Sequence, residues 1–346
     1  MSFRITTNGL FRNYRTNLHQ NQERMNDSMA HVSSQRLFNS YAEDPAAASE
    51  AFQIRRNMWR TDDQIENSEY LISKFSTAFN AMDPIVDGTD ESSDLSGIRE
   101  ALRGINGAAG SSRPILGAEL KSVASSVVQL MNTKYGDEYV FAGTDGLNTP
   151  FAWKDEDDGT RSLLYRGEDV NSLSSSSSYL SEASYVDIGL GMQSDENGIV
   201  NPATAYNSAL CGADYLGYGR DADGDSKNLA VLMDELGSIF TRCDSDGNYA
   251  SAADEARAGV LVGKLSDAID RVQEKHVTLS AQVNYLQTNE EQLKEVKLDM
   301  NENLEKTERM DLADAITEMM WAQYSYNAAL RIGNSILSQS LIDYLN

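Results

Sequence analysis

The sequence predicts a mainly α-helical fold with a β-containing insertion, in which long, coiled-coil-like N- and C-terminal helices pair with each other. Three observations predict it: glycine-poor ends, heptad repeats at both ends, and a glycine-rich, acidic middle. All glycines except Gly9 and Gly333 lie between residues 88 and 263, and no proline follows Pro202. Glycine and proline cost about 1 and 3 kcal/mol in a helix interior. The ends are therefore suited to long helices, and the middle to strands, turns and loops.

The N-terminal end carries two apolar stripes, separated by the stretch Asn39–Pro45. The shorter stripe is Leu18, Met25, Met29 and Val32. The longer stripe is Ala51, Ile54, Met58, Thr61, Ile65, Ser68, Ile72, Phe75, Phe79 and Met82. Its 3–4 spacing is that of a heptad seam. We expect Pro84 to end this helix.

The C-terminal end has three apolar stripes. The first is Leu265, Ile269, Val272, His276, Leu279, Val283 and Leu286; after a phase break at Glu290, the second is Leu293, Val296 and Met300. The third is Leu312, Ile316, Met319, Gln323, Tyr326 and Leu330, followed by the apolar tail Ile336, Leu337, Leu341, Ile342 and Leu345. One helix from 264 to 332 would be about 100 Å long, which indicates either a coiled-coil rod or packing against other copies.

The partners of these stripes differ. We expect residues 51–82 and 265–286 to form an intramolecular core. The outermost stripes, 18–32 and 316–345, have each other and neighbouring subunits as partners. Because an isolated helix pair is marginal in water, we expect both ends to be loose in the free monomer.

The middle of the chain predicts short strands and one helix. Phe151–Trp153 and Leu163–Tyr165 flank an acidic turn and predict a hairpin. Tyr139–Phe141 and Tyr185–Ile188 predict further strands, and Asn228–Phe240 predicts a helix.

The composition excludes several functions. The chain has 346 residues, is 40% hydrophobic and has a formal net charge of −24. This surface would repel nucleic acid, and no apolar run is long enough for membrane insertion. The first residues lack the apolar segment of a cleavable signal peptide. Cys211 and Cys243 allow either one disulfide or two thiols.

No catalytic or cofactor constellation stands out, so we expect neither an enzyme nor a cofactor. His19, His31 and His276 are scattered on predicted helices, and we expect His276 to be a core residue. Gly217–Ala222 matches a loose dinucleotide pattern but precedes an acidic loop, which favours a turn. Convergent groups distant in sequence leave an enzyme open as an alternative, testable by a hydrolase or protease screen.

One metal hypothesis has some substance. Asp244, Asp246 and Asn248 occupy positions 1, 3 and 5 of an EF-hand-type loop, and Glu255 occupies position 12. Tyr249 stands where glycine is preferred. The similar segment 221–225 has a leucine at position 12. We favour acidic solvated turns and keep a calcium-dependent surface-binding or adhesin module as an alternative.

Several segments resemble the bacterial flagellin superfamily. They are Arg4-Ile-Thr6, the connection Ser33–Asn39 with Glu43–Ala48, Lys134–Thr144, Tyr165–Glu168, Asp311–Ile316 and Asp343–Leu345. Arg36, Asn39, Asp44 and Pro45 carry the connection motif, and Pro45 favours the hook–filament junction group (hook-associated protein 3) over filament flagellins. The resemblance covers about residues 1–170 and 260–346.

The resemblance implies a domain organisation and a set of assembly residues. Residues 1–45 and 300–346 would be terminal assembly helices, 46–150 and 256–299 a helical rod domain with a hairpin, and 151–255 an outer, variable insertion. The implied assembly residues are Leu18, Met25, Met29, Val32, Leu312, Ile316, Met319, Leu330, Ile336, Leu337, Leu341 and Leu345.

The resemblance also implies a structural function. The chain would form a ring that joins hook to filament, burying the apolar stripes of its terminal helices between subunits. Its partners would be other copies, hook-associated protein 1, flagellin and a flagellar export chaperone. It would be exported by the flagellar type III apparatus and lie outside the cell at the junction. A flagellin-type filament subunit is the nearest alternative.

Overall fold

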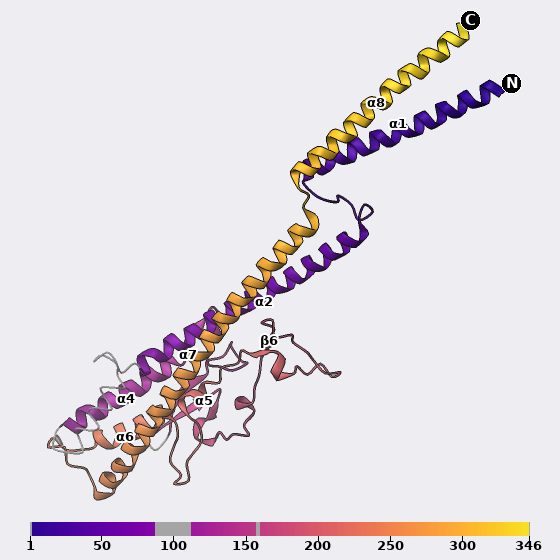
Figure 1. Ribbon diagram of the computed structural model, residues 1–346. Coiled ribbons are helices and arrows are strands. Elements are labelled where there is room, and N and C mark those ends of the chain that lie inside the picture. The colour runs from indigo at the N-terminus through magenta and orange to yellow at the C-terminus, as the bar shows by residue number, and fades with distance from the viewer. Residues whose placement is uncertain (1, 87–111, 157–159, 346) are drawn as a thin grey trace. The chain divides into compact units, whose positions relative to one another are not determined.

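The computed structural model describes residues 2–86, 112–156 and 160–345 (Figure 1). The chain forms two compact units, Met1–Asp62 with Glu295–Asn346 and Asp63–Lys294. Two long helices, α2 (Pro45–Val86) and α7 (Ala252–Glu308), contribute residues to both units. The predicted fold class, mainly α with paired terminal helices and a β-containing insertion, is confirmed.

The first unit contains the two ends of the chain. Helices α1 (Ser2–Ser34) and α8 (Leu312–Leu345) lie side by side (Figure 1). They run antiparallel, because the end of α1 is bonded to the start of α8 through Met310 N and Gln35 O, 3.1 Å apart. The C-terminal stripes therefore do not form one continuous rod, since α7 ends at Glu308 and three residues separate it from the start of α8 at Leu312.

Helix α2 follows its predicted stripe, with all ten stripe positions buried or half-buried. It ends two residues after Pro84, so the expectation that this proline ends the helix is wrong. A proline lacks only its own N–H and has a helical φ, so it is tolerated near a helix end better than in the middle.

The second unit has its core between helices from distant parts of the chain. On α7, Leu265, Ile269, Val272, His276, Leu279 and Leu286 are buried, which confirms the predicted intramolecular core. His276 is 9% exposed and stacks on Phe79 with ring centroids 4.2 Å apart. Its expected role as a core residue is confirmed.

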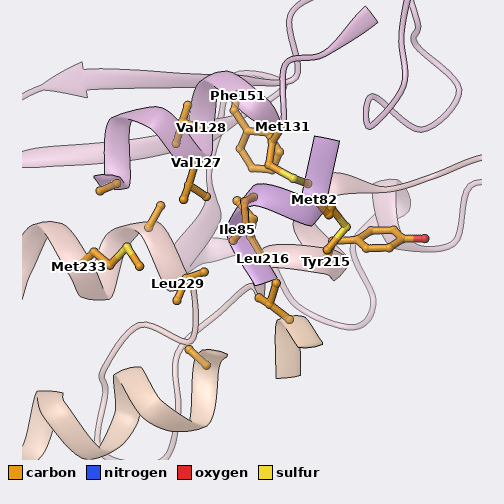
Figure 2. Close-up of a cluster of buried hydrophobic side chains, with 14 of the residues drawn as sticks. Met82, Ile85, Val127, Val128, Met131, Phe151, Tyr215, Leu216, Leu229 and Met233 are labelled. Carbon is orange, nitrogen blue, oxygen red and sulfur yellow. The ribbon is translucent and has the colours of Figure 1, made fainter. Parts of the chain in front are cut away.

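Helices α4 (Arg113–Leu130) and α6 (Leu229–Thr241) cross closely in this core. A Cβ added at Gly117 would lie 2.8 Å from Gly237 O, and one at Gly237 would lie 2.8 Å from Gly117 O. Glycine at both positions lets the two backbones approach. Figure 2 shows neighbouring side chains of this core, where Val127 of α4 and Met233 of α6 belong to one buried cluster.

The strands are short, and those in the described ranges form three small antiparallel sheets. They are β1 (Lys134–Tyr135) with β2 (Glu138–Tyr139), β3 (Phe151–Asp155) with β4 (Arg161–Tyr165) and β5 (Glu168–Asp169), and β6 (Tyr185–Val186) with β7 (Tyr206–Asn207). A short helix, α5 (Gly212–Leu216), and the 3-10 turns η2 (Val170–Ser172), η3 (Ser178–Leu180) and η4 (Pro202–Thr204) complete the insertion.

The sequence predictions for this region are partly confirmed. The hairpin pairs Phe151 with Tyr165 and Asp155 with Arg161, as expected. Helix α6 is also confirmed, with the Asn228 carboxamide oxygen accepting from Ala230 N at 3.0 Å. The strand predicted over 139–141 stops at its first residue, and the next two side chains are fully buried in the core.

Candidate functional site

The seam between α1 and α8 is defined by burial at 4–3 spacing. On α1 the half-buried seam positions are Tyr14, Leu18, Asn21, Met25, Ser28 and Val32. On α8 the buried or half-buried positions are Ala315, Met319, Ala322, Tyr326, Ala329 and Gly333. The predicted residues Leu18, Met25, Val32 and Met319 thus lie on the seam within one molecule.

Small residues line the α8 side of this seam, and three of its six positions are displaced by one from the predicted stripe. The two helices approach closely at Gly333, where an added Cβ would overlap the hydroxyl and ring of Tyr14 on α1. Alanine and glycine let the larger α1 side chains fit against the helix. The apolar stripe seen in the sequence therefore coincides only in part with the face that α8 buries in the free chain, at Met319 and Tyr326.

Most of the large apolar side chains on the described part of α8 are left exposed. We call them the outer α8 surface: Leu312, Ile316, Met320, Trp321, Tyr324, Leu330 and Ile332, with exposures of 45, 39, 51, 69, 69, 42 and 56%. On α1, Met29 is 54% exposed. A monomeric helix gains nothing from displaying so many large apolar groups, which instead is typical of interaction surfaces.

The sequence prediction found only part of this surface. It included Leu312, Ile316 and Leu330 but missed Met320, Trp321, Tyr324 and Ile332. The available signal was the presence of large apolar residues on more than one face of the same helix. The predicted residues Ile336, Leu337, Leu341 and Leu345 lie in the last turns of α8, beyond the described side chains.

The connection between α1 and α2 is built by the motif residues. The Asp44 carboxylate accepts hydrogen bonds from Ala46 N at 3.0 Å and Ala47 N at 2.9 Å. Pro45 is the first residue of α2, where its missing N–H costs nothing. Asp44 is therefore the N-cap of α2, the role that aspartate fills well because its oxygen satisfies otherwise unpaired amides.

The other two motif residues hold the connection in place. Asn39 N donates to the Glu43 carboxylate at 2.7 Å, and this bond lowers the pKa of Glu43. Arg36 forms an antiparallel bridge with Arg309, at the break between α7 and α8. The connection and the break are therefore bonded to each other.

Ion pairs tie α2 to α7 within the first unit. Arg55 lies 2.5 Å from Glu308, and Lys297 lies 2.5 Å from Asp62. The Glu308 side chain is 14% exposed, so its ion pair is shielded from solvent more than a typical surface pair.

The candidate calcium loop forms a closed turn. The Asp244 carboxylate accepts from Asp246 N at 3.0 Å and from Asn248 N at 2.7 Å, and the bonds from Asn248 lower its pKa. Glu255 lies in the first turn of α7 and is exposed. Calcium binding here stays a prediction.

A second acidic loop holds a lysine. Lys264 Nζ lies 2.6 Å from the Asp221 carboxylate and 3.1 Å from that of Asp223, and it also contacts Asp225. The bond to Lys264 lowers the pKa of Asp221 to about 2 and lowers that of Asp225. These three carboxylates could geometrically hold a metal ion, but the ammonium already supplies a positive charge among them.

Both cysteines are free thiols, which answers the question left open by the sequence. Burial raises the pKa of Cys211 and of Cys243, so neither is an activated nucleophile. Within the described residues, no helix has the length and apolar character needed to cross a membrane.

The chain is similar to known proteins both in sequence and in structure. Residues 5–145 match the family model of the bacterial flagellin N-terminal helical region. A Vibrio parahaemolyticus protein proposed to be a flagellar hook-associated protein has a similar structure, with a TM-score of 0.55 and 17% identity over 77% of this chain and 100% of that chain. No curated protein sequence matches the chain.

Two further solved structures are similar at lower scores. Bacillus cereus FlgL has a TM-score of 0.45 and 14% identity, covering 73% of this chain and 99% of that chain. Flagellar hook-associated protein 3 of Legionella pneumophila has a TM-score of 0.49 and 12% identity, covering 73% and 98%.

The fold, with paired terminal helices, is similar to that of the proposed flagellar hook-associated protein from Vibrio parahaemolyticus. The terminal helices pair with each other, and the insertion lies between them in sequence. More particularly, residues 5–145 match the bacterial flagellin N-terminal helical region, which confirms the resemblance to the flagellin superfamily.

Proposed function

We propose that this chain is a structural subunit of the bacterial flagellum that joins hook to filament by assembling into a ring with other copies of itself. The observation that carries the proposal is the outer α8 surface, seven large apolar side chains left exposed on a helix that pairs through small residues. The flagellin N-terminal region supports the flagellar context.

The mechanism is burial of this surface between subunits. At about 25 cal/mol per Å², burying the exposed half of one such side chain contributes about 1 kcal/mol. Seven of them contribute about 7 kcal/mol per subunit before the costs of association and ordering are subtracted. Contributions of this size matter when they are repeated around a closed ring.

The proposed division of the chain follows from this mechanism. Residues 1–45 and 300–346 assemble, 46–150 and 256–299 form the helical rod domain with its hairpin, and 151–255 face outward. The partners are hook-associated protein 1 on one side and flagellin on the other, with an export chaperone before secretion. The location is outside the cell, at the hook–filament junction, reached through the flagellar export apparatus.

A matched pair of substitutions tests the proposal. Met320→Glu places a charge on the outer α8 surface, and Leu147→Glu places one at a residue that is 77% exposed in the second unit. Each variant is expressed in cells that lack the native chain. Met320→Glu should keep its helix content by circular dichroism but fail to restore attached filaments, whereas Leu147→Glu should restore them.

Two further measurements examine the ends directly. A chain cut to about 46–299 should fail to form junctions, and hydrogen exchange of the free full-length chain should be faster in α1 and α8 than in the second unit. Attached filaments in the Met320→Glu strain, or terminal helices as protected as the second unit, would contradict the mechanism.

A flagellin-type filament subunit remains the second candidate, because the matching family model is named for flagellin. Labelled protein on intact cells separates the two. Label confined to a band between hook and filament supports the junction subunit, whereas label along the filament supports the filament subunit.

A further inference from the structure

The second unit contains a cavity of about 540 Å³ that the proposed assembly does not use. The Gly217–Gly219 turn forms part of its lining, together with α7 residues around Arg271. Both glycines have positive φ, 93° and 72°, so the turn depends on glycine. A Cβ at Gly217 would overlap the carbonyl of Lys227, another lining residue. Around Gly217, the cavity wall is therefore formed by two backbone segments in close contact.

The charge of this cavity is opposite to that of the chain. Four basic residues line it, Arg220, Lys227, Arg271 and Lys275, against the acidic residues Asp214 and Glu274. The chain as a whole carries −24. Lys275 is neutralised by Asp214, 2.5 Å away.

Among the residues that the structure describes, the other three cations have no carboxylate partner. Arg220 donates to the Gly224 carbonyl at 2.6 Å, and Arg271 donates to the Lys227 carbonyl at 2.9 Å. In the described part of the chain, no carboxylate lies within ion-pair distance of Arg220, Lys227 or Arg271. A carbonyl bond orients a guanidinium but leaves its charge and several of its five N–H donors available.

The remaining lining suits a sugar. Ser174, Ser175 and Thr278 bring hydroxyl groups, and the half-buried Tyr218 brings an aromatic ring. Hydroxyls bond to sugar hydroxyls, aromatic rings pack against the apolar faces of pyranose rings, and guanidinium groups bind carboxylates in a bidentate manner. The volume is that of a small-ligand site.

We propose that this cavity binds an acidic saccharide, with the carboxylate of a uronic acid held by Arg271, Arg220 and Lys227. The site lies in the second unit and its residues belong to the insertion and to α7. It is independent of the terminal helices, so the proposal does not depend on the ring assembly.

Isothermal titration of the full-length free chain tests the site with three probes at matched ionic strength. Trigalacturonic acid carries the carboxylates, galactotriose is its neutral counterpart, and sodium sulfate is an anion without a sugar. Trigalacturonic acid should bind with a Kd of about 1 mM or tighter, and the other two should bind at least about tenfold more weakly.

A pair of arginine variants locates the binding. Arg271→Gln should weaken trigalacturonic acid binding about tenfold or more, the loss typical of a charged hydrogen bond. Arg242→Gln is the control, because Arg242 is exposed, pairs with Asp254 and does not line the cavity. It should change the Kd by less than about twofold. Thermal unfolding of both variants should match the unsubstituted chain.

Each other outcome overturns the proposal. An absence of trigalacturonic acid binding at about 1 mM removes the site. Equal binding of galactotriose removes the role of the cations, and equal binding of sulfate removes the role of the sugar. An Arg271→Gln variant that folds and binds normally places the ligand elsewhere.

Discussion

Replacing Gly117 by alanine tests the close crossing of α4 and α6. An added Cβ would lie 2.7 Å from the backbone nitrogen of Thr241 and 2.8 Å from the carbonyl oxygen of Gly237. Both are backbone atoms, so they can move away only if α6 itself shifts. Gly259→Ala is the matched control, because Gly259 also lies inside a helix, α7, and an added Cβ would meet nothing within 4 Å.

The expected magnitude follows from two opposing contributions. Alanine gains up to about 1 kcal/mol over glycine in a helix interior, and this gain applies to both variants. Overpacking costs about 1–3 kcal/mol and applies only at Gly117. The Gly117→Ala chain should therefore be about 1–3 kcal/mol less stable than the Gly259→Ala chain. The control itself should be slightly more stable than the unsubstituted chain.

Urea unfolding measures this difference. Trp153 fluorescence, in a chain whose Trp59 and Trp321 are replaced by phenylalanine, reports on the unit that contains both glycines. The free energy of unfolding of each variant comes from linear extrapolation. If Gly117→Ala were as stable as Gly259→Ala, the two helices would not be in the close contact that the structure describes, and the reasoning would be refuted.

Three other predictions concern the cap, the lysine-filled loop and the terminal seam. Asp44→Ala should weaken the first turn of α2 by about 1 kcal/mol, measured by hydrogen exchange of its first amides, whereas Asp44→Asn should keep most of the cap. Lys264 holds the pKa of Asp221 at about 2. The contribution of this ion pair to stability is therefore complete above the unfolded-state pKa of 3.8 and is lost as pH falls toward 2. A Lys264→Met chain should therefore lose less stability over that pH interval, which acid-unfolding curves would show; parallel curves would contradict it. Gly333→Leu should separate α1 from α8, because the added side chain needs the space of an aromatic ring of α1. Limited proteolysis within α1 should then be faster than in the exposed control Ala328→Leu, and equal rates would argue against the seam.

The helical core was predictable because its signal is local. Leu265, Val272 and Leu279 repeat at a spacing that can bury one face only if the segment is a helix, and all three are fully buried. The cap at Asp44 was likewise visible as part of the connection motif next to Pro45, although only the structure shows its role as a cap.

The seam of α8 was not predictable in the same way. Hydrophobicity marks Leu312, Ile316 and Leu330, whereas the buried face consists largely of alanine and glycine. Such residues carry little hydrophobic signal and are selected by how closely two helices approach. The strand expected over 139–141 failed for a related reason, since a short apolar run predicts burial but not a ladder.

The polar sites depend on contacts between distant segments. Lys264 reaches Asp221 across 43 residues, and Arg271 of α7 lines the cavity together with Arg220, which belongs to the loop before α6. A sequence shows the acidic loop and the lysine separately, but their meeting is a property of tertiary packing. From the sequence alone, segment 221–225 therefore resembled a calcium-binding loop.

The ammonium of Lys264 has a consequence for the surroundings in which this protein can stay folded. Three neighbouring carboxylates repel one another unless a positive charge lies among them, and a dissolved cation is one source of that charge. Here the counterion is part of the polypeptide, because Lys264 of α7 contacts all three aspartates. The shape of this loop is therefore expected to be independent of the concentration of divalent metal ions in the medium.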